Sequence, residues 1–230
     1  MAYPIFGRSS WVFLFMLTWQ VSEVWQSRPG YAATNRPTQR IILLGDSLTE
    51  GYGVPKDKAF PALVESQLKT DGYSGVEVIN AGISGSTTAG GESRLRWYLK
   101  KNPEVVLLAL GGNDGLRGMP VDETKRNLEK IIILAKKNHI KILLAGMQMP
   151  PNYGKKYTEE YKKLYFDLAR IHHLPMVPFL LEGIAGNREF NQEDGIHPNE
   201  YGHRKIAELV TPHLEKMISK KSEKVNDPLP

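Results

Sequence analysis

Short runs of mostly hydrophobic residues recur along the chain from position 41 onward, and each run ends at glycine, asparagine or proline. A run without regular polar alternation is typical of a parallel strand whose two faces are both covered. The pattern therefore predicts about five buried strands, at positions 41–44, 76–79, 105–110, 140–145 and 176–177.

Between these runs, hydrophobic residues return at helical spacing. The stretch 121–137 carries one apolar stripe, and a last helix is expected from about residue 200 to residue 218. Similar spacing marks helices at 60–68 and 95–99. Because alternating strands and helices form βαβ units with right-handed crossovers, we expect one α/β domain with a parallel sheet and helices on both faces.

Composition narrows the possible functions. The 230 residues suit one domain, and with 41% hydrophobic and 24% charged residues the chain can bury a core. The net charge is only +5 and the basic residues are scattered, which argues against a nucleic-acid-binding protein. The chain has no cysteine, which excludes a disulfide scaffold, a thiolate metal site and a cysteine nucleophile.

The two ends of the chain differ from the rest. Near the N-terminus, Arg8 precedes an apolar run that is too short to span a membrane, and a Gly-Tyr-Ala triplet follows at 30–32. This order is typical of a signal peptide, so we expect residues 1–32 to direct export to the periplasm or the medium. An uncleaved anchor and an amphipathic helix are the alternatives. A single domain is expected at 38–219, with a polar tail at 220–230.

Reactive side chains follow the predicted strands at their carboxyl ends, where α/β sheets collect functional sites. Ser47 lies just after the first run, on an expected strand-to-helix turn, and by itself is better explained as a helix N-cap. Asp194 and His197 lie three residues apart in a loop before the last helix. A serine nucleophile needs a base and a carboxylate that orients the base, so the three residues together indicate nucleophilic catalysis.

Two further residues are candidates to stabilise an oxyanion. Gly85 follows the second predicted strand and can present a bare backbone N–H, while Asn113 follows the third and can add a side-chain donor. With the Ser47 N–H they make three donors. The structural alternative for Gly85 is a turn with positive φ, and the alternatives for Asn113 are a helix cap or an Asx-turn. We expect Asp46 and Asp114 to support the site through hydrogen bonds.

These residues stand in four ordered blocks, which are Gly45-Asp46-Ser47-Leu48, Gly85, Gly112-Asn113-Asp114 and Asp194-Gly195-Ile196-His197-Pro198. The blocks resemble those of the SGNH, or GDSL, hydrolases. The stretches 80–87, 110–118 and 151–154 are also similar to the branch that contains bacterial periplasmic thioesterases, lysophospholipases and arylesterases. The resemblance implies a three-layer α/β/α, flavodoxin-like fold.

The resemblance also implies roles for the candidate residues. Ser47 would be the nucleophile, His197 the base and Asp194 its orienting carboxylate, with Gly85, Asn113 and the Ser47 amide as the oxyanion hole. The expected reaction is hydrolysis of acyl esters or thioesters through an acyl-enzyme, without metal or cofactor. We expect a monomer that acts on small molecules and makes at most transient contact with lipid. A carbohydrate O-acetyl esterase and a non-catalytic lipid- or glycan-binding module are the alternatives.

Substrate-binding residues are harder to predict from the sequence. The apolar segment 147–157 is expected to form a loop at the active-site end of the sheet, where it either lines an acyl groove or covers the core. The candidates for contact with an acyl chain are Ile83, Leu116, Met149, Pro151 and Tyr153.

Overall fold

The computed structural model describes residues 39–220, all of which lie in one compact unit. The predicted signal peptide and the predicted tail from residue 221 onward lie outside the described residues. None of the helices within 39–220 is long and hydrophobic enough to cross a membrane.

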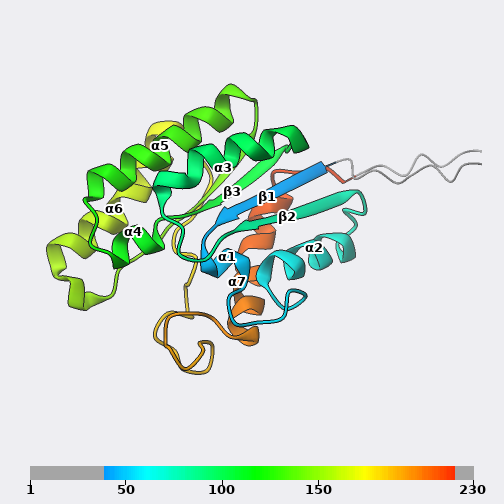
Figure 1. Cartoon of the computed structure of the whole chain (residues 1–230). Coiled ribbons are helices and arrows are strands. Elements are labelled where there is room, and N and C mark those ends of the chain that lie inside the picture. The colour runs from blue at the N-terminus through cyan, green and yellow to red at the C-terminus, as the bar shows by residue number, and fades with distance from the viewer. Residues whose placement is uncertain (1–38, 221–230) are drawn as a thin grey trace, which may run out of the picture. The chain divides into compact units, whose positions relative to one another are not determined.

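Five parallel strands form one sheet in the order β2-β1-β3-β4-β5 (Figure 1). All five predicted strands are confirmed, and the first two extend beyond their hydrophobic runs to end in glycine. The strands are β1 (Gln39–Gly45), β2 (Val76–Gly82), β3 (Val105–Ala109), β4 (Lys141–Ala145) and β5 (Met176–Val177).

Helices cover both faces of the sheet. Helices α2 and α7 pack together on one face, and α3, α5 and α6 cover the other, which gives the expected three layers (Figure 1). The helices are α1 (Ser47–Glu50), α2 (Phe60–Thr70), α3 (Gly91–Tyr98), α4 (Gly112–Leu116), α5 (Val121–Lys137), α6 (Lys155–His172) and α7 (Glu200–Glu215). Short 3₁₀ turns are η1 (Thr88–Gly90), η2 (Leu99–Lys101) and η3 (Pro151–Tyr153).

The expected loop at 147–157 is only partly a loop, because η3 and the first turn of α6 begin inside it. In α6, Tyr161, Leu164 and Tyr165 return at helical spacing and are buried against the sheet. Tyrosine supplies much of this apolar stripe, so the helical pattern is less evident in the sequence than in the leucine- and isoleucine-rich α5.

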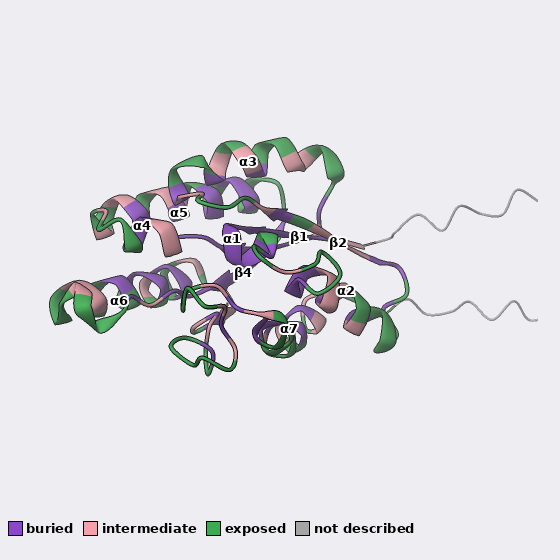
Figure 2. Ribbon diagram, turned by 60° about the horizontal axis from the view of Figure 1, so that its bottom comes forward, coloured by how far each residue is buried: buried purple, intermediate pink, exposed green. Residues whose placement is uncertain are grey.

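The core lies along the central strands β1 and β3, in which residues 41–45 and 105–109 are all buried. Figure 2 shows the buried part of the sheet enclosed between the helices. Each fully buried leucine or isoleucine in these strands contributes roughly 1.5–3 kcal/mol through removal of apolar surface from water. The edge strand β2 is less buried, and Glu65 of α2 accepts a hydrogen bond of 2.8 Å from its Val78 N–H. The Glu65 carboxylate thus pairs a backbone N–H at the edge of the sheet that could otherwise hydrogen-bond to a strand of another molecule.

Glycines at the ends of β1 and β2 let α1 pack closely against the ends of these strands. A Cβ on Gly45 would lie 1.8 Å from Thr49 Oγ1, and a Cβ on Gly82 would lie 2.1 Å from the Glu50 backbone nitrogen. Side chains at these two positions would push α1 away from the sheet. The glycines therefore place Ser47, the first residue of α1, directly at the carboxyl end of the sheet.

A buried histidine joins the two helices on the α2–α7 face. His203 is fully buried, and its Nδ1 accepts a hydrogen bond of 3.3 Å from the Phe60 N–H. Burial lowers the pKa of His203 from 6.5 to about 4, and the charge of His197 acts in the same direction. The folded protein therefore holds this imidazole neutral at pH values where the unfolded chain protonates it.

His203 is expected to make the protein less stable in mild acid. The pKa of His203 is lower in the folded protein than in the unfolded chain. Its contribution to the free energy of unfolding is therefore fully present above the unfolded pKa and is lost as the pH falls toward the folded pKa. The asparagine carbonyl in His203→Asn can replace Nδ1 as the acceptor without titrating. Between about pH 7 and pH 4.5, wild type should lose about 2 kcal/mol more unfolding free energy than the variant in urea titrations. Equal losses would contradict this assignment.

Candidate active site

Ser47, His197 and Asp194 form a continuous hydrogen-bonded chain at the carboxyl end of the sheet. The Ser47 Oγ lies 3.0 Å from His197 Nε2, and His197 Nδ1 lies 2.7 Å from Asp194 Oδ2. Ser47 is 9% exposed, so its hydroxyl is largely shielded from bulk water. The structure thus brings together three side chains that the sequence separates by up to 150 residues.

The loop before α7 fixes the carboxylate of Asp194. Its Oδ1 accepts hydrogen bonds of 2.9 Å from the backbone N–H groups of Ile196 and His197, which leaves Oδ2 for the imidazole. Burial tends to raise the pKa of Asp194, but the hydrogen bonds from His197 and Ile196 outweigh it and lower the pKa to about 2. Asp194 is therefore ionised at neutral pH and favours a proton on His197 Nδ1.

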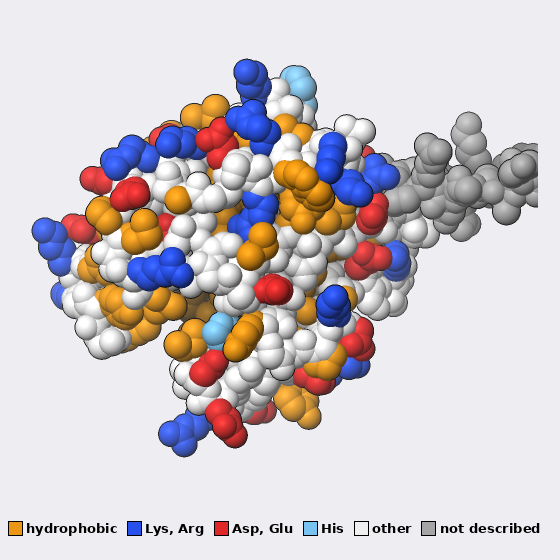
Figure 3. Space-filling model, viewed as in Figure 1, with side chains coloured by type: hydrophobic (Ala, Val, Ile, Leu, Met, Phe, Trp, Pro, Cys, Tyr) orange, Lys and Arg blue, Asp and Glu red, His pale blue; other side chains and the backbone are white. Residues whose placement is uncertain are grey.

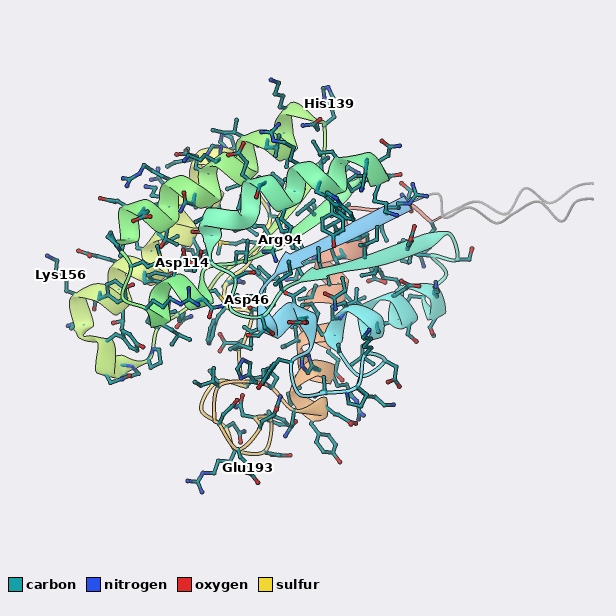
Figure 4. All side chains as sticks on the ribbon, in the orientation of Figure 1. Asp46, Arg94, Asp114, His139, Lys156 and Glu193 are labelled. Carbon is teal, nitrogen blue, oxygen red and sulfur yellow. The ribbon has the colours of Figure 1, made fainter. Side chains whose placement is uncertain are left out.

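Asp46 holds the turn that carries Ser47. It caps α1, and its carboxylate accepts a hydrogen bond of 3.1 Å from the Leu48 N–H, as expected for this residue. Burial raises the pKa of Asp46 to about 6, while the Leu48 hydrogen bond and the charge of Arg94 oppose that rise. Arg94, which the sequence analysis did not single out, comes from α3 and lies near Asp46 in Figure 4.

The two oxyanion candidates lie on neighbouring segments that contact each other. Gly85 has a φ of +74°, a conformation that favours glycine. Asn113, in the first turn of α4, donates from Nδ2 to the Ser86 carbonyl at 3.0 Å. Asp114 supports the same loop, because its carboxylate accepts hydrogen bonds from the backbone N–H and hydroxyl of Thr88. The predicted supporting role of Asp114 is thus seen in the structure.

The five substrate candidates do not share one environment. Ile83 is 54% exposed and Leu116 is 37% exposed, while Met149 is 9% exposed and packs beneath Gly115. Pro151 is exposed, and the hydroxyl of the half-buried Tyr153 donates to the Leu116 carbonyl at 2.8 Å. The methionines of the segment 147–157 therefore cover the core, as one of the two alternatives predicts, while its later residues are exposed or half-buried.

The surface near these residues is hollowed. Figure 3 shows hydrophobic side chains beside a hollow between α4 and the segment that precedes α7. A second, open pocket of about 620 Å³ lies beyond Gly85, with Ile83, Arg94 and Trp97 in its walls.

Within residues 39–220, no group of three or more histidine, aspartate or glutamate side chains is arranged to hold a metal ion.

Two contacts close to the catalytic candidates were not predicted from the sequence. The Tyr52 ring lies 4.7 Å from the His197 ring, measured between centroids. Gln192 donates from Nε2 to the Tyr52 carbonyl at 2.7 Å and to the Pro198 carbonyl at 3.0 Å. The only sign of these contacts in the sequence is that Tyr52 lies five residues after Ser47.

A serine, a histidine and an aspartate form a hydrogen-bonded chain at the carboxyl ends of the strands of a parallel sheet in an α/β/α fold. This is the arrangement of a serine hydrolase. A profile of the GDSL-like lipase/acylhydrolase family matches residues 43–205. The chain belongs to this family and is a hydrolase.

Individual relatives agree with this assignment. The chain is 38% identical to an arylesterase from Vibrio mimicus over 81% of its own length and 94% of the relative. It is 36% identical to thioesterase 1/protease 1/lysophospholipase L1 from Escherichia coli K12, over 78% of this chain and 85% of the relative. The crystal structure of TesA matches with a TM-score of 0.75 and 38% identity, over 78% of this chain and all of that one.

Proposed function

We propose that the protein hydrolyses carboxylic esters and thioesters of acyl chains, with Ser47 as nucleophile, His197 as base and Asp194 as its orienting carboxylate. The observation that carries the proposal is the hydrogen-bonded chain from Asp194 through His197 to Ser47. The names of the relatives, arylesterase and thioesterase/lysophospholipase, support this class of substrate.

The geometry supports a two-step acyl transfer. In the first step, Ser47 Oγ attacks the carbonyl carbon and its proton moves to His197 Nε2, which lies 3.0 Å away. The backbone N–H groups of Ser47 and Gly85 and the side-chain amide of Asn113 would stabilise the oxyanion that forms. His197 then gives the proton to the departing oxygen or sulfur atom, and the acyl group remains on Ser47.

In the second step, water attacks the acyl-enzyme carbonyl while His197 accepts its proton. The tetrahedral intermediate collapses, the proton returns to Ser47 Oγ and a carboxylic acid leaves. Asp194 remains ionised through the cycle because three hydrogen-bond donors hold its pKa at about 2. Its negative charge stabilises the imidazolium that exists between the two proton transfers.

The surroundings of Ser47 support an acyl chain as the group that is bound. Ile83, Leu116, Pro151 and Tyr153 present exposed or half-buried apolar surface on the segments that follow β2, β3 and β4, at the carboxyl edge of the sheet where Ser47 also lies. We propose that these side chains contact the acyl chain and that Met149 forms the wall behind them.

We also propose that residues 1–32 are a signal peptide, that the enzyme works as a monomer, and that it acts in the periplasm or outside the cell.

A chain-length series tests the substrate class. We expect kcat/KM for p-nitrophenyl esters to rise from acetate to a medium or long chain and then level off. Each methylene that becomes buried is worth about 0.8 kcal/mol, so the rise should reach about fourfold per CH₂ within the groove. Initial rates from acetate to palmitate give the profile. Activity restricted to acetate would contradict acyl-chain recognition and favour an O-acetyl esterase.

A further inference from the structure

An exposed tyrosine packs against the imidazole of the active site. The Tyr52 ring is 52% exposed, yet its centroid lies 4.7 Å from the His197 ring centroid with an angle of 44° between the planes. Tyr52 also donates its backbone N–H to the Ser47 carbonyl at 3.1 Å. One residue thus touches both the histidine and the turn that carries the serine.

A glutamine ties the same two segments together. The Gln192 amide donates to the Tyr52 carbonyl at 2.7 Å and to the Pro198 carbonyl at 3.0 Å. Its backbone N–H donates to the His197 carbonyl at 2.8 Å. Gly53, which follows Tyr52, has a φ of +77°, and a Cβ there would lie 2.1 Å from Gln192 Oε1. The glutamine side chain therefore fits closely between the turn after α1 and the loop that carries His197.

We propose that Tyr52 and Gln192 are positioning residues for His197, an inference that rests on the proposed function. Gln192 fixes the distance between the two segments, and the Tyr52 ring packs against the imidazole. The hydrogen bond to Asp194 fixes one ring atom and leaves the ring free to tilt about it. The packed tyrosine opposes that tilt and keeps Nε2 directed at Ser47 Oγ.

The tyrosine has a second effect during the reaction. His197 becomes positively charged after it takes the serine proton, and the face of an aromatic ring attracts a nearby cation. This attraction is present while the imidazolium exists and absent in the resting enzyme, so it lowers the barrier rather than strengthening substrate binding. Loss of the ring should therefore reduce kcat and leave KM nearly unchanged.

Three substitutions at one position separate the contributions. Tyr52→Phe keeps the ring and should stay within about twofold of wild-type kcat, whereas Tyr52→Leu keeps apolar cover without the ring and should lose about tenfold. Tyr52→Ala removes both and should lose more. Tyr201, on α7, is 62% exposed, and Tyr201→Leu is the matched control that should leave kcat unchanged.

Gln192→Met tests the second contact, because methionine has a similar shape and no hydrogen-bond donor. It should also lower kcat at constant KM, and melting temperatures will show that each variant is folded. The proposal is overturned if Tyr52→Leu and Gln192→Met keep wild-type kcat, if Tyr52→Phe falls as far as Tyr52→Leu, or if KM alone changes. Wild type without hydrolytic activity would instead refute the proposed function itself.

Discussion

Ser47→Ala is expected to lower kcat/KM for ester hydrolysis by roughly 10⁴- to 10⁶-fold. The Ser47 Oγ is the atom that the hydrogen-bonded chain from Asp194 and His197 reaches, and in the proposed mechanism it is the atom that forms the acyl-enzyme. Asp46 caps α1 through its own side chain and does not need the serine hydroxyl, so the variant should fold normally. Steady-state kinetics with a p-nitrophenyl ester measures the loss.

Thr49→Val provides the matched control for the serine substitution. Thr49 lies on the same short helix, is fully buried, and its hydroxyl has no hydrogen-bond partner in the structure. Valine preserves its volume and removes the hydroxyl, so activity should remain near that of wild type. Equal activity of Ser47→Ala and Thr49→Val would show that the nucleophile lies elsewhere.

Asp194→Asn is expected to lower kcat by roughly 10³- to 10⁴-fold while the protein stays folded. Oδ1 of Asp194 accepts hydrogen bonds from the N–H groups of Ile196 and His197, so the oxygen of an asparagine must occupy that place. Its NH₂ group would then face His197 Nδ1 and donate to it. This moves the imidazole proton to Nε2, which can no longer accept the proton of Ser47.

The neighbouring acidic residue gives a control with the same change of charge. Glu193 is exposed and lies on the outer side of the loop in Figure 4. Glu193→Gln therefore removes one negative charge from the same loop without touching the imidazole, and it should leave kcat unchanged. A comparable loss in both variants would mean that the charge of the loop, and not the Asp194–His197 hydrogen bond, controls the rate.

Much of the fold could be predicted because its signals are local. Each strand is a contiguous apolar run, and α5 carries a regular stripe, so neither requires knowledge of the tertiary structure. The hydrogen bond between Asp194 and His197 was also predictable, because the two residues lie three positions apart in a tight loop that brings their side chains together. The position of Ser47 follows from its place directly after a buried strand.

The remaining features depend on contacts between distant segments. Gln192 reaches Tyr52 across 140 residues, and the apolar sequence around Met149 does not reveal which of its side chains face the core. The proximity of Arg94 to Asp46 likewise arises from the packing of α3 beside β1. Such contacts leave no periodic signal in a single sequence, since each is set by how separate elements meet.

The most direct test of the central claim is covalent labelling of the wild-type protein with a fluorophosphonate, followed by peptide mass spectrometry. Because Ser47 has a base within 3.0 Å of its Oγ, it should react stoichiometrically with the phosphorus centre, and the adduct should map to Ser47 alone. Absence of labelling, or an adduct on another residue in a folded protein, would contradict the account.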